Sequence, residues 1–491
     1  MKPKYLLYGL TLAVLFLALA ACSASQPSPT AAPTIAPTVA PTLAPTMPPT
    51  VAPTKVPPTA VPPTATATPI PPTATPEAGL HVVNVANYTD SSGNFHVVGE
   101  IKNSDKKILT QMELTIVIQD ASGKSLLKDK NDNAADSVTF SPMLTNLAPG
   151  ESSPFDYSLD AGTGTPDPKS VSVTVTGQNT SDITRASVEI QHAQMVASGS
   201  DFYLVSGEIV NKSDKPVEVR DLAAALVDSS GNVMSVDYSV DYAIYLLPAG
   251  DADQRDISPF YLSVNNPGAR PADYKTYLDV EEVAQPDTYA VEIEITNHYF
   301  DNTGTFHIIG NATNNSSDTL TTQIVAGLYD KDGIVLDAYS TSSPVNLAPG
   351  EVMPYDISTF ANVNNNTDEA KRLDHFTVQI DDYFTFPSSI ETVALKSTND
   401  KVAKDDTNME WTITGQVANS TAKNLSGEIV MAQVFDSDGK LVAVNYSWIT
   451  PSGDSLAPGD VSSYNVVVPL DSTITDTTGY TFKTLVKGEV K

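Results

Sequence analysis

One pattern of about a hundred residues is repeated four times in this chain, and it limits the possible folds more than any other feature. Each copy contains an aromatic-x-[Val/Ile]-x-Gly strand motif and, about twenty residues later, an Asp-x-x-Gly motif. The strand glycines Gly99, Gly207, Gly310 and Gly415 are 108, 103 and 105 residues apart. A hundred residues can close one small core. The sequence therefore predicts an array of four similar units.

Apolar residues alternate with polar ones inside each copy, which predicts half-buried antiparallel strands. In the first copy Phe95, Val97 and Ile101 would face the core together with Gly99. His96 and the equivalent His307 fall on the opposite face and are predicted to be solvated. A glycine in the middle of the inward face predicts that a bulky side chain or backbone from the opposite sheet approaches there.

Two turn motifs follow the first strand in every copy. The Asp-x-x-Gly segments predict hairpin turns in which the aspartate caps the turn and the glycine has a positive φ. Positions two, four and six before this aspartate are apolar and are expected in the core. A Leu-(Ala/Pro)-(Pro/Ala)-Gly loop comes later, with an aromatic five residues beyond its glycine in three copies; the second copy has Arg255 there.

These patterns predict an all-β fold of four tandem immunoglobulin-like β-sandwich domains, with a small barrel as the alternative. The domains would lie behind a signal peptide and a disordered stalk rich in proline and threonine. The predicted boundaries are 1–21 for the signal peptide, 22–79 for the lipid-anchored linker, and 80–179, 180–286, 287–388 and 389–491 for the four sandwiches.

The third copy also resembles a known family. Leu328-Tyr329-Asp330, with Gly333 and the later Leu-Ala-Pro-Gly, is similar to the FxLYD domain of bacterial cell-envelope lipoproteins. The fourth copy has Val434-Phe435-Asp436, and the first two keep only the aspartate and glycine. The resemblance implies an immunoglobulin-like sandwich of unassigned function and supplies no catalytic or ligand residues.

The first residues predict export and lipid anchoring. Lys2 and Lys4 precede an apolar run that ends in Leu19-Ala20-Ala21-Cys22, a layout typical of a signal peptide. This ending resembles the bacterial lipobox, which implies that Cys22 is lipidated and holds the protein on a membrane, facing outside the cytoplasm. Cys22 is the only cysteine, so it has no disulfide partner.

The segment from Gln26 to Glu77 predicts a spacer. It holds 17 of the 36 prolines and repeats Ala-Pro-Thr-x. Proline fixes φ and lacks a backbone donor, so this segment can build neither helix nor sheet and is expected to be an extended polyproline stretch.

Charge and motif content exclude several functions. The net charge is −30, and nucleic acid is not expected as a partner because binding it needs a basic face. The six histidines lack paired metal-ligand spacing, and neither a nucleophile elbow nor a phosphate-binding loop is present. We therefore expect no enzymatic activity and no cofactor.

Calcium is the one ion that the sequence suggests. Asp330 with Asp332, and Asp436 with Asp438, place two carboxylates on one turn, and Glu281, Glu282 and Asp287 cluster at a predicted domain junction. A Ca²⁺ site needs six to eight oxygen ligands. These segments supply too few alone, so plain turns are the preferred interpretation.

Two functional classes remain. The first is a surface-anchored rod of sandwiches for structural or adhesive contact with a protein or glycan. The second is a solute- or glycan-binding receptor component of the envelope. Tyr446 and Trp448 in the fourth copy are the candidate contact residues, because two rigid aromatics give a large contact area at low entropic cost. Trp411 matches the aromatic core position of all four copies and is expected to be packing.

Overall fold

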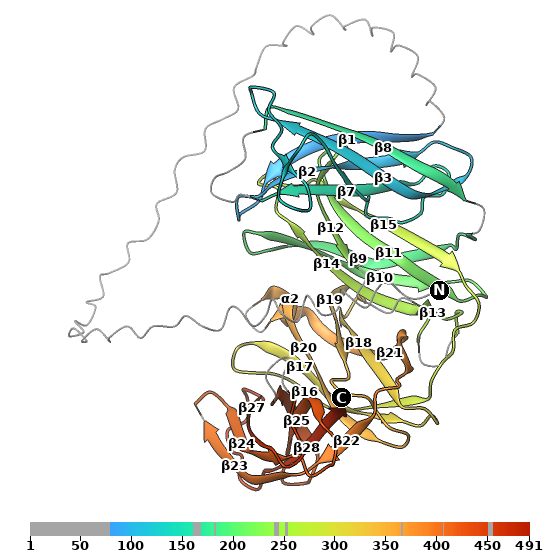
Figure 1. Cartoon of the computed structure of the whole chain (residues 1–491). Coiled ribbons are helices and arrows are strands. Elements are labelled where there is room, and N and C mark those ends of the chain that lie inside the picture. Colours follow the sequence, from blue (N-terminus) through green and yellow to red (C-terminus); the bar gives the residue numbers. More distant parts are fainter. Residues whose placement is uncertain are drawn as a thin grey trace, which may run out of the picture. The chain divides into compact units, whose positions relative to one another are not determined.

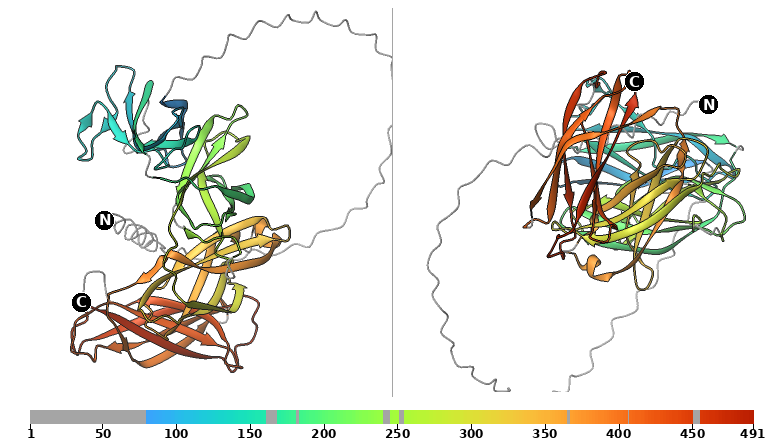
Figure 2. Two further views of the ribbon diagram at one scale, coloured as in Figure 1. Left: turned by 90° about the vertical axis from the view of Figure 1, so that its right-hand side faces the viewer. Right: turned by 90° about the horizontal axis from the view of Figure 1, so that it is seen from below.

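The computed structural model describes residues 79–160, 168–180, 183–239, 245–250, 254–364, 367–405, 407–449 and 455–491. Their regular secondary structure is almost entirely β-strand, with the short helix α2 (Asp368–Arg372) as the one described helix (Figure 1). Two further views show the same dominance of strands (Figure 2). None of the helices described is long and apolar enough to cross a membrane. The predicted all-β class is confirmed.

The first two repeats contain fifteen of the strands. In repeat one these are β1 (Leu80–Thr89), β2 (Phe95–Asn103), β3 (Ile108–Gln119), β4 (Leu127–Lys128), β5 (Ala134–Ala135), β6 (Val138–Phe140), β7 (Ser152–Leu159) and β8 (Ser170–Thr180). In repeat two they are β9 (Val188–Ser198), β10 (Phe202–Asn211), β11 (Val217–Val227), β12 (Val233–Ser239), β13 (Tyr245–Leu246), β14 (Ile257–Asn265) and β15 (Asp273–Glu282).

Repeats three and four contain the remaining thirteen strands. Repeat three has β16 (Val291–Phe300), β17 (Thr305–Asn314), β18 (Leu320–Asp330), β19 (Val335–Ser342), β20 (Val352–Asn364) and β21 (Leu373–Pro387). Repeat four has β22 (Thr392–Leu395), β23 (Ser397–Asp405), β24 (Glu410–Ala418), β25 (Leu425–Phe435), β26 (Leu441–Trp448), β27 (Val461–Pro469) and β28 (Thr481–Val490).

Each repeat folds into two main antiparallel sheets. In repeat three one sheet has the order β16-β17-β20 and the other β19-β18-β21, and the corresponding strands pair in the same way in the other repeats. Phe306 and Ile308 from the first sheet share a core cluster with Ile324 and Leu328 from the second. Two sheets that share one core form a β-sandwich.

The core and turn positions predicted from the motifs are confirmed. All twelve apolar positions before the turn aspartates are buried: Leu114, Ile116, Ile118, Leu222, Ala224, Leu226, Ile324, Ala326, Leu328, Val430, Ala432 and Val434. In the first turn the carboxylate of Asp120 accepts hydrogen bonds from the backbone N–H groups of Ser122 (2.8 Å) and Lys124 (3.0 Å). Gly123 has a φ of 81°, and the other three turn glycines also have positive φ.

An aromatic side chain packs over each strand glycine. Gly99 lies opposite Phe155, Gly310 opposite Tyr355, and Gly415 opposite Tyr464. The approach comes from the neighbouring strand of the same sheet, not from the opposite sheet as the sequence suggested. In repeat two Phe260 pairs with Gly207, so the aromatic is retained five residues later than Arg255.

The prediction of half-buried strands with solvated outer faces holds for β3 and β27, where buried residues alternate with more exposed ones, but it is wrong for β2. In β2 the outward His96, Val98 and Glu100 are all buried. Glu100 accepts a hydrogen bond from the Tyr277 hydroxyl of repeat two at 2.8 Å. The outer face of this sheet is buried because the next repeat packs against it.

The three junctions between successive repeats differ in polarity. The core cluster of repeat one includes Ala223, Val233 and Tyr277 of repeat two, and that of repeat three includes Ile429 and Met431 of repeat four. Within the described residues, the core cluster of repeat two contains no member of repeat three. Repeats one and two, and repeats three and four, therefore share continuous apolar cores.

Polar contacts join repeat two to repeat three. The Ser206 hydroxyl and the Gln194 amide both donate to the Val335 carbonyl, at 2.6 and 2.8 Å. Arg255 pairs with Asp382 at 2.9 Å. This central junction consequently depends on hydrogen bonds and an ion pair more than on a shared core.

Candidate functional site

The predicted contact residues Tyr446 and Trp448 lie at the C-terminal end of β26. Their rings meet edge to face with centroids 6.5 Å apart. Tyr446 is 46% exposed and Trp448 52% exposed. Strand pairing places Trp448 opposite Ile429 and Tyr446 opposite Met431, on the sheet face that meets repeat three. The pair therefore forms an exposed aromatic surface beside that junction.

A glycine and a carboxylate lie beside the Trp448 ring. Gly427 has a φ of 57°, and a Cβ built on it would lie 3.6 Å from the Trp448 ring and 3.3 Å from a Glu489 carboxylate oxygen. Burial raises the pKa of Glu489. An aromatic ring beside a carboxylate is a combination that can stack on a sugar ring and accept its hydroxyl hydrogens.

Trp411 is part of the core, as the sequence predicted. It is buried and belongs to the same apolar cluster as Ile413 and Val466. The Lys404 ammonium lies 4.2 Å from the ring centroid.

Several of the carboxylates considered for calcium pair with protein cations. Asp330 pairs with Arg372 at 2.7 Å, Glu282 with Lys215 at 2.5 Å, and Glu281 with Arg220. No group of three or more His, Cys, Asp or Glu side chains in the described ranges is placed to hold a metal ion. Cys22, the predicted lipidation site, lies outside the described residues.

His96 and His307 are not solvated, which corrects a prediction made above. Each ring lies between two carboxylates and stacks on a tyrosine: His307 Nδ1 is 2.8 Å from Asp356, its Nε2 is 3.5 Å from Asp301, and Tyr299 lies 4.9 Å from its centroid. Burial lowers the pKa of His307, but the charges of Asp356 and Asp301 outweigh this effect and raise the pKa to about 9. Both histidines form structural ion pairs with these aspartates, next to the apolar junctions.

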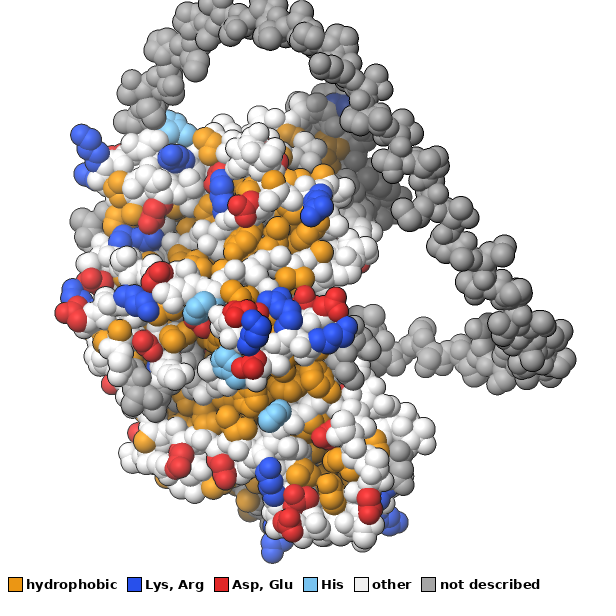
Figure 3. Space-filling model, turned by 180° about the vertical axis from the view of Figure 1, so that it is seen from behind, with side chains coloured by type: hydrophobic (Ala, Val, Ile, Leu, Met, Phe, Trp, Pro, Cys, Tyr) orange, Lys and Arg blue, Asp and Glu red, His pale blue; other side chains and the backbone are white. Residues whose placement is uncertain are grey.

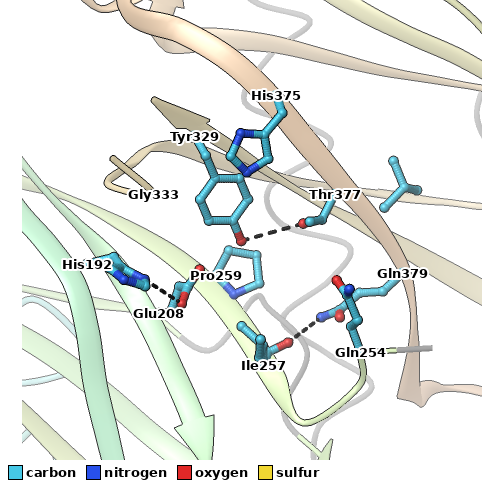
Figure 4. Close-up of a pocket in the computed structure, with 11 residues that line it drawn as sticks. His192, Glu208, Gln254, Ile257, Pro259, Tyr329, Gly333, His375, Thr377 and Gln379 are labelled. Atoms are coloured by element: carbon cyan, nitrogen blue, oxygen red, sulfur yellow. Dashed lines mark hydrogen bonds and ion pairs between the residues drawn. The ribbon is translucent and has the colours of Figure 1, made fainter. Parts of the chain in front are cut away.

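A pocket of about 220 Å³ lies at the polar junction between repeats two and three (Figure 4). Repeat two contributes the ion-paired His192 and Glu208, and repeat three contributes Tyr329, His375 and Thr377. The full lining is His192, Glu208, Gln254, Ile257, Pro259, Tyr329, Gly333, His375, Thr377, Val378 and Gln379. Seven of these eleven residues have polar side chains, set in a lining that is otherwise mainly apolar, so the pocket can offer a few hydrogen-bonding groups to a ligand.

Glu208 is the buried charged group of this pocket. It is 7% exposed, and its Oε2 lies 3.1 Å from Nδ1 of His192. The Tyr329 ring is buried beneath His375, which stacks on it at 5.1 Å. Burial, and then the charge of Glu208, raise the pKa of Tyr329, so its hydroxyl keeps its hydrogen and can donate.

The sequence reasoning missed this pocket. One feature of the sequence could have indicated it. A glutamate directly follows the strand glycine in repeats one and two alone, as Glu100 and Glu208. A charged residue in that position cannot be interpreted before the burial of the outer face is known.

Charged side chains of both signs are interspersed on the surface. On the face drawn in Figure 3, acidic and basic groups alternate, and hydrophobic side chains reach the surface in several separate patches. An extended basic face, which nucleic acid would need, is not visible there.

Comparison with known proteins gives only distant similarity. No family model and no curated protein matches the chain. Among solved structures, red sea bream transglutaminase is 11% identical over 54% of this chain and 36% of its own length, with a TM-score of 0.14. The native conformation of E. coli alpha-2-macroglobulin is 9% identical over 84% of this chain, with a TM-score of 0.12, and the matched part spans 28% of that protein. This chain thus matches about a third or less of either structure.

Proposed function

We propose that this chain is a lipid-anchored envelope protein whose β-sandwich repeats present a contact surface for a protein or glycan outside the cytoplasm, in an adhesive or structural role without catalysis. The signal sequence ending in Cys22 supports the anchor, and the proline-threonine segment supports a spacer between membrane and repeats. The resemblance of repeat three to FxLYD lipoprotein domains agrees with this setting.

The exposed pair Tyr446 and Trp448 is the observation that carries the contact function. Burying two large aromatic rings in the core would stabilise the fold, yet both stay about half exposed. Large rings at a surface add binding energy through contact area and stacking. The Glu489 carboxylate lies beside the ring and could accept hydrogen bonds from a ligand that stacks on it, such as a sugar.

A glycan and peptide array probed with the full chain tests this function. Trp448→Ala and Tyr446→Ala are each expected to reduce binding at least tenfold, while the far-ultraviolet circular dichroism stays unchanged. Phe386→Ala is the matched control, because Phe386 is also exposed, at 45%, but lies in repeat three. Binding that survives both substitutions in repeat four would remove the basis for a contact surface there.

Solute binding is the second candidate, and the pocket at the central junction is the observation that favours it. A receptor component would hold its ligand in a concave, mostly enclosed site with a few polar groups. The aromatic pair is an open surface instead, so the two candidates place the ligand in different repeats.

A further inference from the structure

The junction between repeats one and two contains a partly exposed site in which a lysine ammonium meets a buried carboxylate. Lys275, on β15, directs its ammonium to the Gly231 carbonyl at 2.8 Å and to the Glu100 carboxylate at 3.4 Å. The Tyr277 hydroxyl donates to the same carboxylate at 2.8 Å, and the Asn84 amide donates at 3.0 Å. Glu100 is thus satisfied entirely by protein groups.

The junction between repeats two and three has the same framework without the lysine. Glu208 replaces Glu100, since each directly follows the strand glycine and lies opposite a proline. His192 replaces Asn84; each begins the bulge in the first strand, with φ values of 53° and 54°. Gly333 replaces Gly231 as the turn glycine. Each group that surrounds the Lys275 ammonium therefore has a counterpart in the pocket lining.

The counterpart of Lys275 is Thr377. Lys275 pairs with Ala225 and Thr377 with Gly327, each three residues before its turn aspartate. A threonine is too short to reach Glu208, and its hydroxyl lies 3.5 Å from the Tyr329 hydroxyl instead. Arg372, a nearby cation, donates to Asp330 and Gln194. The space that the lysine chain would fill is part of the pocket.

We propose that this pocket binds a small primary alkylammonium compound, with Glu208 as the anionic partner and the Gly333 carbonyl as the second acceptor. An ammonium group there would recreate the contacts that Lys275 makes in the sister junction. Charge-assisted hydrogen bonds to a buried carboxylate are stronger than neutral ones. A chain of two to four carbons matches the shortening from lysine to threonine. The proposal does not depend on the adhesive role of repeat four.

Ligand-observed NMR on the full chain tests the proposal with n-propylammonium as the probe and n-propanol as its neutral control. We expect n-propylammonium to bind with a Kd on the order of 1 mM, because so few atoms limit affinity. n-Propanol and potassium ions should fail to compete. Glu208→Gln should weaken binding at least tenfold. Equal competition by propanol or potassium, or full binding by Glu208→Gln, would overturn the ammonium assignment.

Filling the pocket from within gives the complementary test. Thr377→Lys should abolish propylammonium binding and raise the melting temperature, because the new side chain would reach the vacant site. Thr377→Leu fills the same space without charge and should also block binding, which covers the case that Thr377→Lys does not fold. Lys275→Thr should create a second site and double the stoichiometry. Binding that persists in both Thr377 variants would show that the pocket is not the site.

Discussion

Gly310→Ala is the most direct test of the packing described for the strand glycines. A Cβ at Gly310 would lie 2.2 Å from the Glu294 carbonyl oxygen and 2.4 Å from the Tyr355 hydroxyl oxygen. The carbonyl belongs to β16, which is paired with β17, and Tyr355 is buried. Because the nearer atom, the Glu294 carbonyl oxygen, belongs to the backbone, the strand pairing itself has to shift.

The magnitude follows from two opposing effects. Overpacking a core costs about 1–3 kcal/mol, while replacing a strand glycine by alanine recovers about 0.5–1 kcal/mol of chain entropy. We therefore expect Gly310→Ala to destabilise repeat three by about 1–2 kcal/mol. The equivalent glycines form a matched series: at Gly99 the nearest atom is the tip of the Phe155 ring at 2.6 Å, and at Gly207 it is Ala193 Cβ at 2.9 Å. The cost should fall in that order.

Hydrogen exchange with mass spectrometry on the full chain is the suitable assay, because several repeats need not unfold in one step. The free energy of opening should fall in β17 for Gly310→Ala and stay unchanged in β10. A cost for Gly207→Ala equal to or above that for Gly310→Ala would refute the link between contact distance and stability. A uniform loss in all repeats would refute the local mechanism.

Three further predictions follow from burial and charge. Because the pKa of His307 is raised from its usual 6.5 to about 9, its ion pairs should stabilise the fold fully below pH 6.5 and lose up to about 3 kcal/mol as the pH rises to 9; urea unfolding of His307→Gln should lack this slope. Glu428 is fully buried, both its oxygens lack a hydrogen-bond partner, and burial raises its pKa. Glu428→Met, which copies Met112 of repeat one, should raise the free energy of unfolding by about 1–3 kcal/mol, and an unchanged or lower urea midpoint would contradict this. Cys22→Ala should abolish fatty-acid labelling and release the protein from the membrane fraction; retention without label would disprove lipid anchoring.

The sequence was sufficient to predict the core positions and the turn glycines within a repeat. Alternation placed the residues before each turn aspartate in the core, because that face is buried by the same repeat. The φ of Gly123 and its relatives followed from turn chemistry. These features depend on neighbours within about a hundred residues.

Contacts between repeats could not be predicted in this way. His96 and Glu100 alternate like surface residues, but the next repeat covers them. No feature of the neighbouring sequence indicates this burial. Phe260 was missed because the loop before it is longer in repeat two, so a fixed spacing from the glycine failed. The pocket was missed because its residues come from two repeats. Their role becomes clear only by comparison with the equivalent junction, where Lys275 takes the place of Thr377.

The alternation of apolar and polar junctions has a mechanical consequence. A chain held at one end and pulled at the other loads its junctions in series, so the one with the lowest barrier opens first. Short-range polar contacts such as Arg255 with Asp382 rupture after a small displacement, whereas shared cores must first expose apolar surface to water. Under tension the junction between repeats two and three should therefore yield before the other two, lengthening the molecule while every sandwich remains folded. Such a step would absorb sudden pulls and would take the Glu208 pocket apart while the force lasts, because its lining comes from both repeats.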